Sequence, residues 1–526
     1  MSGTQNQKDY DLIVIGSGIG GLATAALMAR LKKWRVLVLE RHKVAGGFTH
    51  GFQRIGGYEW DVGVHYVGMM KPGLKERKLF DFVTDSQLDW QRISEPFDVF
   101  EYPGLKMEVL SSENKQRSQL LDLFPKEKKA ICQYYKDLKI AERWGVANFI
   151  AGTLPAPFAK LTRLAIIRAK KLALLTTEEY INRSFSDRKL KAIIASQWLA
   201  HGLPPSRSAF GLHAAVVRHY FQGGYFPKGG AGEIAKTISK VIRASGGDIK
   251  IGHEAVEIIL ENGMAVGVKT KTKRKGKDTV LTFHAPAIVS DIGVHATFTK
   301  LLSPSLIKDK YQKLLTIAHQ PPSAISLFIG FKESPEKVGF HGENHWLYNS
   351  FNHEEHIMGI ELVNGVLSAG HLSFPSLKGA SNRKHTAEFF SIVDYQIFDQ
   401  WKNTAFKARD SDYESLKEKI TETILNDIEA RHPGFREIVD YVELATPLSV
   451  EHYMGHSRGA IYGLPATPEK FRQDWIKAVS PVPNLYLTGV DLLCVGVLPG
   501  LLAGAATAGA LHGSFGFLKV MMKTTK

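Results

Sequence analysis

Cysteine is nearly absent from this sequence. Cys132 and Cys494 are the only two among 526 residues, too few and too far apart for a disulfide framework or a cysteine metal site. Such usage is typical of a reducing compartment, and we expect a cytoplasmic protein. The sequence also lacks an apolar run of about eighteen residues, so no helix is expected to span a membrane. A short polar leader precedes the first apolar run, and a signal peptide is therefore not expected.

Acidic residues are in deficit relative to basic ones, 52 against 67, which gives a formal net charge of +15. The densest basic run falls between two strand-like segments, 265–268 and 279–283, and predicts a solvated hairpin tip. We expect no nucleic-acid partner, because no aromatic or base-reading module accompanies the charge. The basic side chains of this run are Lys269, Lys271, Lys273, Arg274, Lys275 and Lys277.

A second basic segment, 154–175, combines charged and apolar side chains at helical spacing. Such a helix can lie in a membrane interface or can cover a core, and the pattern leaves both open. The segment 515–526 also mixes apolar side chains with lysines, and the two together favour peripheral contact with a membrane surface. In the first segment the apolar side chains are Phe158, Leu161, Leu164, Ile167 and Leu172, and the basic ones are Lys160, Arg163, Arg168, Lys170 and Lys171.

The most informative stretch of the chain is 11–40. An apolar run at 12–15 predicts a buried parallel strand, a glycine-rich turn then opens a helix, and a second apolar run at 36–39 ends on Glu40. Glycines let the backbone approach a pyrophosphate at the helix N-terminus, where free N–H groups and the dipole favour anions. The acid about twenty residues further on is placed to accept from a ribose hydroxyl. This order predicts dinucleotide binding by Gly16, Gly18, Gly20, Gly21 and Glu40.

Three further segments indicate that the dinucleotide contains a flavin. Paired glycines after the Glu40 strand, followed by Asp61 and Gly63, allow a loop to pass close to the pyrophosphate and ribitol. The strand 252–259 offers its backbone to an adenine edge. Near the carboxyl end, an acid can accept from a ribityl hydroxyl, and a helix N-terminus can face the flavin's pyrimidine edge. The cofactor contacts predicted here are Arg41, Gly46, Gly47, Asp61, Gly63, Val256, Gly489, Asp491 and Gly500.

Dinucleotide-type segments thus occur at the start, the middle and the end of the chain. The fold class expected is α/β, a Rossmann-type FAD-binding domain with an inserted α+β substrate domain. Between the dinucleotide-type segments, 75–215 has a mostly helical pattern, 323–331 predicts a strand and 413–431 a helix. We assign 1–75, 216–300 and 450–526 to the cofactor domain, and 76–215 and 301–449, with the membrane-contacting helix near 154–175, to the substrate domain.

Taken together, these motifs resemble the flavoprotein superfamily of amine oxidases and carotenoid desaturases. Within it, the chain is most similar to the branch of carotenoid cis-trans isomerases and retinol saturases. The His65-Tyr66 pair after the Asp-x-Gly resembles the retinol saturase side, whereas 75–215 and 300–440 match only in general pattern. Besides the amino-terminal fingerprint, the matching pieces are WDVGVHYVG (60–68), GGYFPKGGAGEI (223–234), HSRGAIYGL (456–464) and LYLTGVD (485–491).

This resemblance implies bound FAD and redox chemistry or isomerisation at a carbon–carbon double bond of a long apolar polyene or acyl lipid. The flavin would supply or accept a hydride, and the sequence does not identify the electron donor or acceptor. A proton must also move, and His65 and Tyr66 are the candidate catalytic residues because both follow the flavin-contacting loop. In the alternative interpretation, Tyr66 packs and His65 hydrogen-bonds the loop.

Two other functions stay open at this point. An amine oxidase-like enzyme would place an aromatic cage for an amine beside the flavin. Rab escort and GDP-dissociation inhibitor proteins resemble the same superfamily but bind prenylated partners without flavin. The intact Gly16, Glu40 and Asp491 argue against such a non-catalytic escort.

We expect neither a metal nor a nicotinamide site. Four histidines crowd one segment, but His353 and His356 do not have the spacing of a metal-binding HExxH helix. A nicotinamide site would need a second fingerprint in the order strand, turn, helix, strand and acid, which the other glycine-rich segments lack. The four histidines are His341, His345, His353 and His356.

Overall fold

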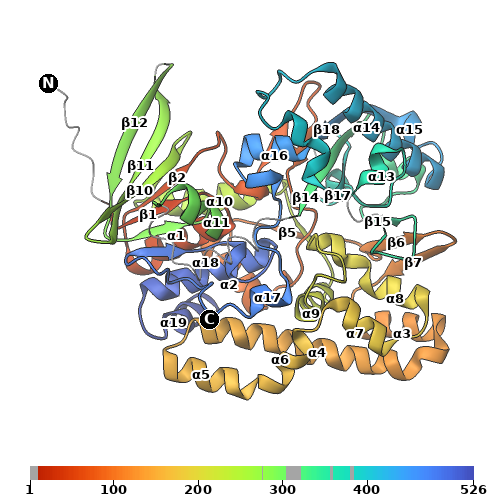
Figure 1. Cartoon of the computed structure of the whole chain (residues 1–526), viewed down its shortest axis with the longest axis horizontal. Helices are drawn as coiled ribbons and strands as arrows, with labels where there is room; N and C mark the ends of the chain where they lie inside the picture. Colours follow the sequence, from red (N-terminus) through yellow and green to blue (C-terminus); the bar gives the residue numbers. More distant parts are fainter. Residues whose placement is uncertain (1–9, 275, 304–321, 356–358, 380–383) are drawn as a thin grey trace.

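The computed structural model describes residues 10–274, 276–303, 322–355, 359–379 and 384–526 (Figure 1). The expectations for the polar leader, Lys275 and His356 lie outside the described residues. Cys132 and Cys494 are both free thiols. Across the described ranges, every helix is too short or too polar to cross a bilayer.

A five-stranded parallel sheet has the order β19-β13-β1-β2-β9. Successive side chains of β1 point to opposite faces, and those of Leu12 and Ile13 are both fully buried. A parallel sheet covered on both faces confirms the α/β fold class. Its strands are β1 (Leu12–Ile15), β2 (Val36–Glu40), β9 (Asp248–Ile251), β13 (Ile288–Ser290) and β19 (Leu485–Leu487).

Helices cover one face of this sheet, with α1 in contact with both α10 and α18. Alanine and glycine dominate α1 and α18 because the two helices approach closely. A Cβ atom on Gly504 would lie 2.7 Å from the Cβ of Ala23, so this contact requires a residue without a side chain. The helices of this layer are α1 (Ile19–Lys32), α2 (Lys75–Thr84), α10 (Gly232–Ala244), α18 (Val497–Leu511) and α19 (Gly516–Thr524).

The other face packs against an antiparallel sheet of β10 (Glu254–Glu261), β11 (Met264–Arg274) and β12 (Lys277–His284). The predicted hairpin is β11–β12, but its basic residues do not all sit at the tip. Lys271 and Lys273 are exposed within β11, while Thr272 between them is half-buried and Thr270 is buried. The alternation of a strand therefore keeps these lysines in water along a face rather than at a turn.

A seven-stranded sheet forms the second half of the molecule, in the order β18-β14-β17-β16-β15-β6-β7. All its neighbours are antiparallel except β15 and β6. The segment 75–215 is thus not only helical, because it supplies β6 and β7 to an edge that only tertiary pairing completes. The strands are β6 (Asp98–Tyr102), β7 (Leu105–Val109), β14 (Ser323–Phe331), β15 (Asn344–Tyr348), β16 (Ala369–Ser373), β17 (Thr386–Val393) and β18 (Val439–Ala445).

Helices cover both faces of the seven-stranded sheet (Figure 1). On one face lies α14, which matches the predicted helix; on the other lie α4 and its neighbours. Where one helix was expected near 154–175, there are two, which meet at Ile166, whose φ of −102° and ψ of 8° are not helical. The break turns Leu172 toward the core while Leu161 stays exposed. These helices are α3 (Glu113–Leu123), α4 (Lys128–Gly152), α5 (Ala156–Ala165), α6 (Ile167–Ala173), α7 (Thr177–Ser184), α8 (Arg188–Ala195), α9 (Phe210–His219) and α14 (Ser411–Arg431).

Shorter elements connect the two halves. The parallel sheet takes its strands only from segments assigned to the cofactor domain, and the seven-stranded sheet only from the others. The domain boundaries themselves stay a prediction. The remaining short elements, of which α13 and α15 lie against α14 in the second half, are β3 (Gly51–Gln53), β4 (Glu59–Asp61), β5 (Trp90–Arg92), β8 (Tyr225–Pro227), α11 (Val294–Lys300), α13 (Ile360–Val363), α15 (Phe435–Ile438), α16 (Pro447–Met454) and α17 (Pro468–Phe471).

Candidate functional site

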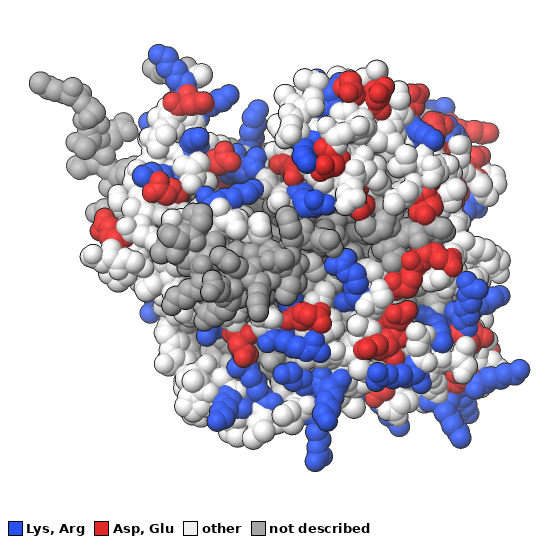
Figure 2. Space-filling model, in the orientation of Figure 1, with Lys and Arg blue, Asp and Glu red and all other residues white. Residues whose placement is uncertain are grey.

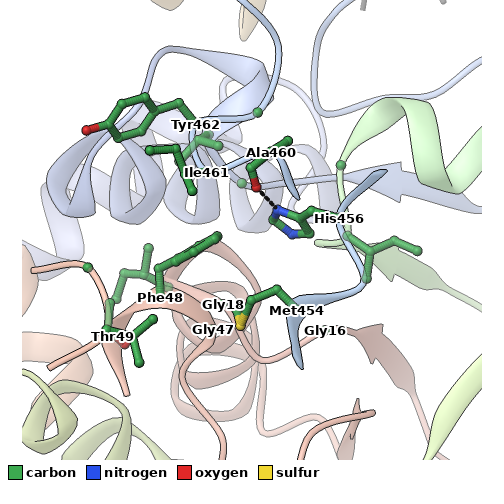
Figure 3. A pocket seen from close by; sticks show the side chains of 18 of the residues that line it. Gly16, Gly18, Gly47, Phe48, Thr49, Met454, His456, Ala460, Ile461 and Tyr462 are labelled. Carbon is green, nitrogen blue, oxygen red and sulfur yellow. Dashed lines mark hydrogen bonds between the residues drawn. The ribbon is translucent and has the colours of Figure 1, made fainter. Parts of the chain in front are cut away.

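A cavity of about 610 Å³ reaches from the glycine-rich turn after β1 to the seven-stranded sheet. Figure 3 shows the loops of Gly16, Gly18 and Gly47 on one side of it and residues 454–462 on the other. The volume is in the usual range for ligand sites, about 300–1,000 Å³. Most residues predicted from the sequence line this cavity: Gly16, Gly18, Gly20, Glu40, Arg41, Gly46, Gly47, Gly63, His65, Tyr66, Val256, Gly489 and Asp491.

Glu40 and Ser17 hold the glycine-rich turn in place. One carboxylate oxygen of Glu40 accepts from the Ser17 amide at 3.0 Å and from its hydroxyl at 2.6 Å, and the other accepts from the His42 amide at 2.6 Å. The second glycine loop joins this group, since the Gly46 amide donates to the Ser17 hydroxyl at 3.0 Å. The acid at the end of β2 therefore fixes the turn and also faces the cavity, where a ribose would lie.

Asp291, which the sequence analysis missed, lies under the turn at the end of β13. A Cβ atom on Gly18 would come within 2.5 Å of its Oδ2, and one on Gly20 within 2.8 Å of its Oδ1. Burial, together with the charges of Glu40 and Asp491, raises the pKa of Asp291 to about 8. The carboxyl group of Asp291 thus leaves no room for a Cβ atom at Gly18 or Gly20. We call this glycine-rich turn, which a phosphate would approach from the other side, the glycine cradle.

The contacts predicted for the far ends of the cofactor have matching geometry. The register between β10 and β11 shifts at Val256, so this residue is unpaired in the β10–β11 ladder, and it lines the cavity. The carboxylate of Asp491 accepts from the Val294 and Leu464 amides, each at 2.7 Å. Arg41 donates to the His452 carbonyl in α16, 2.9 Å away. These residues fit a dinucleotide with a flavin at one end.

Three predicted residues, Gly21, Asp61 and Gly500, are not among those that line the cavity. A Cβ atom on Gly21 would lie 2.5 Å from the Gly16 carbonyl, and one on Gly500 would lie 2.5 Å from Cγ2 of Ile19. Asp61 accepts from the Ala231 amide at 2.9 Å. In this structure the three support the walls, and their direct contact with the cofactor stays a prediction.

Beyond the glycine loops, the cavity ends among polar and aromatic side chains of the seven-stranded sheet. His65 Nδ1 lies 3.3 Å from a carboxylate oxygen of Glu388 on β17. Burial, with the nearby charge of Lys378, lowers the pKa of His65 to about 3, so the ring is neutral. The aromatic and imidazole side chains at this end are Tyr66, Tyr220, Trp346, His371, Phe390 and Tyr462.

Tyr66 is anchored from behind by a chain of hydrogen bonds. Its hydroxyl donates to Asp98 at 2.9 Å, and the Asn344 amide donates to the other oxygen of Asp98 at 2.8 Å. Lys378 then donates to Asn344 and, at 3.1 Å, to the His65 carbonyl. Burial lowers the pKa of Lys378 to about 7, and burial and Asp98 raise that of Tyr66 well above 10. The His65-Tyr66 segment is therefore held from both sides.

Asp98, Lys378 and Glu388 were not found by reasoning from the sequence. Their partners come from strands hundreds of residues away, so spacing along the chain gives no signal. One local signal existed: Glu388 interrupts the otherwise apolar and hydroxyl-bearing run of β17, and it is only 2 % exposed. A charged residue inside a buried strand indicates a paired or functional group.

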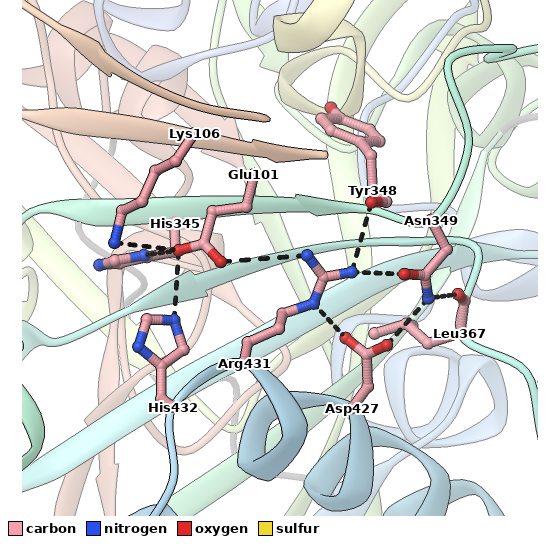
Figure 4. A network of polar contacts seen from close by, with 9 residues as sticks. All are labelled: Glu101, Lys106, His345, Tyr348, Asn349, Leu367, Asp427, Arg431 and His432. Atoms are coloured by element: carbon pink, nitrogen blue, oxygen red, sulfur yellow. Dashed lines mark hydrogen bonds and ion pairs between the residues drawn. The ribbon is translucent and has the colours of Figure 1, made fainter. Parts of the chain in front are cut away.

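A second buried histidine cluster lies on the same sheet, away from the cavity (Figure 4). We call it the Glu101 network. His345 places Nδ1 2.6 Å from Glu101 and Nε2 3.1 Å from Glu343, so both ring nitrogens face carboxylates. Burial alone would lower the pKa of His345, but these two contacts raise it. The network consists of Glu101, Lys106, Glu343, His345, Arg431 and His432.

The spacing in the Glu101 network would suit a metal ion, since ligand atoms of Glu101, His345 and His432 lie within 4.8 Å of one another. The charges do not suit one. A metal ligand must be deprotonated, whereas His345 is positioned to donate from both nitrogens. Arg431 and Lys106 also approach Glu101, at 3.9 and 3.7 Å. The geometry is that of an ion-pair network.

Comparisons with known proteins agree on one family. The model of the family "Flavin containing amine oxidoreductase" matches residues 19–510. An all-trans-retinol 13,14-reductase of Danio rerio is 32% identical over 528 residues, which cover 96% of this chain and 86% of that protein. A chloroplastic prolycopene isomerase of an Oncidium hybrid is 26% identical, over 98% of this chain and 86% of its own. The cyclohexylamine oxidase of Brevibacterium oxydans has the same fold, with a TM-score of 0.57, 14% identity, and 99% and 100% of the chains covered.

Proposed function

Because this chain belongs to the flavin-containing amine oxidoreductase family and uses FAD, we propose that it transfers hydrogen at a carbon–carbon double bond of a long apolar polyene lipid. One observation carries the proposal: a single cavity joins the glycine cradle to its other end at the seven-stranded sheet. We call that end the aromatic chamber; it is lined by Tyr66, Tyr220, Trp346, His371, Phe390 and Tyr462. The similarity to a retinol reductase and a prolycopene isomerase supports the polyene class. Membership of an enzyme family with the cofactor residues in place sets aside the flavin-free escort.

We propose the following division of roles. Glu40 and Asp491 accept from the ribose and ribityl hydroxyls, and the backbone of Val256 pairs with the adenine edge. The N-terminus of α1 faces the pyrophosphate. When bound, FAD supplies or accepts the hydride. A partner that exchanges two electrons with it is required in either direction.

The aromatic chamber would hold the polyene by apolar contact. Phe390 and Trp346 line it, as does Tyr66, which is stacked on Tyr220 with ring centroids 4.3 Å apart. Apolar contact without direction suits a hydrocarbon chain, because each buried Å² contributes about 25 cal/mol. Fixing the chain in this chamber would keep one double bond beside the flavin, where orientation governs the rate.

Of the two proton-donor candidates, the geometry favours His65. The hydroxyl proton of Tyr66 is directed at Asp98, away from a substrate. His65 lines the cavity with its Nδ1 3.3 Å from Glu388, and Lys378 holds the backbone of this residue through its carbonyl. We propose that His65 moves the proton and that Tyr66 and Lys378 position it.

The experiment that tests the function starts from the visible spectrum of the purified protein. Its flavin is reduced anaerobically with dithionite and mixed with a polyene. We expect reoxidation of the flavin together with loss of one conjugated double bond from the polyene spectrum. Bleaching of the oxidised flavin by a primary amine, with no reaction of the polyene, would instead support the amine oxidase alternative. A protein that neither carries nor takes up FAD would contradict the cofactor assignment.

Glu40→Ala tests the cofactor site directly. Loss of its carboxylate frees Ser17 and removes the ribose acceptor, so we expect less bound flavin per protein after gel filtration. Glu257→Ala, an exposed acid on β10, is the matched control and should keep its flavin. Full flavin occupancy in Glu40→Ala would remove Glu40 from the site.

We also propose that the protein lies on a membrane surface. On α5, Phe158, Leu161 and Leu164 expose 51, 66 and 63 % of their surface. The patch continues onto the carboxyl-terminal helix, since the rings of Phe158 and Phe515 lie 5.1 Å apart, and Met522 on α19 is also exposed. Figure 2 shows lysine and arginine side chains along the lower edge of the molecule, where Figure 1 places α4, α5 and α6. Apolar bulk beside basic charge suits an anionic lipid interface.

Sedimentation with liposomes tests this surface. The double variant Leu161→Ser, Leu164→Ser should lose binding to vesicles that contain phosphatidylserine, and raised salt should weaken binding of the unmodified protein. Val280→Ser, an equally exposed apolar position on β12, is the control. Unchanged sedimentation of the double variant would exclude α5 as the contact.

A further inference from the structure

His371 is a polar side chain of the chamber to which the described residues offer no hydrogen-bond partner. It lies in the middle of β16, is only 1 % exposed and lines the cavity. Its ring is enclosed by His65, Trp346 and Phe390, with ring centroids at 4.8, 4.6 and 5.1 Å. Among the described residues, it is the histidine for which both ring nitrogens are buried without a hydrogen bond.

Such an arrangement is costly unless a ligand completes it. A buried donor or acceptor left unpaired costs about 1–3 kcal/mol, and native proteins satisfy the great majority of such groups. Another buried histidine, His353, shows the usual solution, because Trp198 donates to its Nδ1 at 3.1 Å and its Nε2 lies 3.0 Å from the Tyr102 hydroxyl. His371 has no equivalent hydrogen bond to any of the described residues.

The surroundings also determine which group His371 can accept. Burial lowers its pKa well below 6.5, with Lys378 and two other histidines nearby, so the ring stays neutral. A neutral imidazole offers one N–H donor and one lone pair. A hydroxyl can donate a hydrogen bond to the lone pair or accept one from the N–H, whereas a hydrocarbon can do neither. A carboxylate would face the Glu388 side chain, which lines the same chamber.

We propose that His371 is the specificity-determining residue for the substrate, and that it hydrogen-bonds a neutral hydroxyl at the polar end of the polyene. The bond would fix how far the chain enters the chamber and so which double bond lies beside the flavin and His65. This inference rests on the proposed function and adds the group by which the substrate is recognised. No covalent step is assigned to His371.

The test uses the flavin-loaded protein and three polyenes of one chain length, which end in a hydroxymethyl, a carboxylate or a methyl group. Binding is followed by the change in the flavin spectrum. We expect the alcohol to bind about tenfold or more tightly than the other two, the ratio that one unmet buried hydrogen bond predicts. His371→Phe should remove this preference by weakening the alcohol alone, and His371→Gln should keep part of it. His341→Phe, at an exposed position, should leave the preference unchanged.

Two results would overturn the proposal: equal binding of the three polyenes by the unmodified protein, or equal weakening of all three in His371→Phe. Flavin content shows whether each variant is folded. If His371→Phe does not fold, the preference for the alcohol is measured in His371→Gln instead. Should no polyene bind or reoxidise the flavin, the proposed function fails as well. Should all react without regard to His371, only the present inference fails.

Discussion

Two histidine clusters lie buried in the seven-stranded sheet, and they differ in how their polar atoms are used. In the Glu101 network, both nitrogens of His345 meet carboxylates, and the pKa of the ring is raised. In the chamber, burial lowers the pKa values of His65 and His371, and neither nitrogen of His371 has a hydrogen-bond partner in the described part of the chain. His345 and His371 are equally buried, each with 1 % of its surface exposed. Complete pairing therefore indicates a structural role, and incomplete pairing beside a cavity indicates a binding or catalytic one.

The largest effect that separates the clusters is expected from His65→Asn. Loss of the imidazole through which the proton is proposed to move should slow reoxidation of the reduced flavin by a polyene about 10²–10⁴-fold, while flavin content stays the same. Single-turnover stopped-flow spectroscopy measures this rate. His432→Asn, in the Glu101 network, is the control and should keep the rate per bound flavin. A rate within threefold of the unmodified protein in His65→Asn would transfer the role to Tyr66, for which Tyr66→Phe is the check.

The opposite pattern is expected from Glu101→Gln. This change leaves the buried His345 and the half-buried Arg431 without their shared carboxylate, and breaking a buried pair typically costs about 3–5 kcal/mol of unfolding free energy. Urea unfolding measures the loss, and the reoxidation rate per bound flavin should not change. Glu257→Gln removes an exposed partner of Lys269 and should cost at most about 1 kcal/mol. Equal losses in the two variants would mean that the network adds nothing beyond a surface pair.

The smallest effect is in the pH dependence of stability. Because the folded pKa of His345 is raised, its contribution is complete below about pH 6.5 and is lost as the pH rises through the folded value. The pKa of Glu101 is lowered by His345 and His432 against the effect of burial, so its contribution is lost as the pH falls below about 4.5. The stability difference between the unmodified protein and Glu101→Gln should be greatest near pH 5–6.5 and shrink as the pH rises above that range. A difference that grows above pH 7 would contradict the ion-pair assignment.

The cofactor half of the fold could be predicted because its signals are local. The β1-α1-β2 unit lies within thirty residues, and its glycine-rich turn and Glu40 follow one another in a recognisable order. In the other half, β14 and α14 were predicted from their own patterns. The strands β6 and β7 were missed because they are short, and a strand that pairs with β15, more than 200 residues away, gives no local periodicity.

The chamber could be predicted only in part. His65 and Tyr66 were found because they adjoin a recognisable loop. The roles of Asp98, Lys378 and His371 depend on neighbours that only the folded chain brings close, and the three residues are far apart in the sequence. Asp291 was missed for the same reason, since its relation to Gly18 and Gly20 arises when β13 pairs beside β1. Chemistry that depends on cross-strand neighbours cannot be read from spacing along the chain.

The parallel sheet has a consequence for biosynthesis. Its central strand starts at Leu12, and its edge strand β19 starts at Leu485, so at about 5–20 residues per second the ribosome makes them about 24 to 95 s apart. Until then β13 has an open hydrogen-bonding edge, and the cradle lacks Gly489 and Asp491. FAD capture must therefore be a late event in the life of the nascent chain. In cells short of riboflavin, the yield of folded protein should fall before its specific activity does.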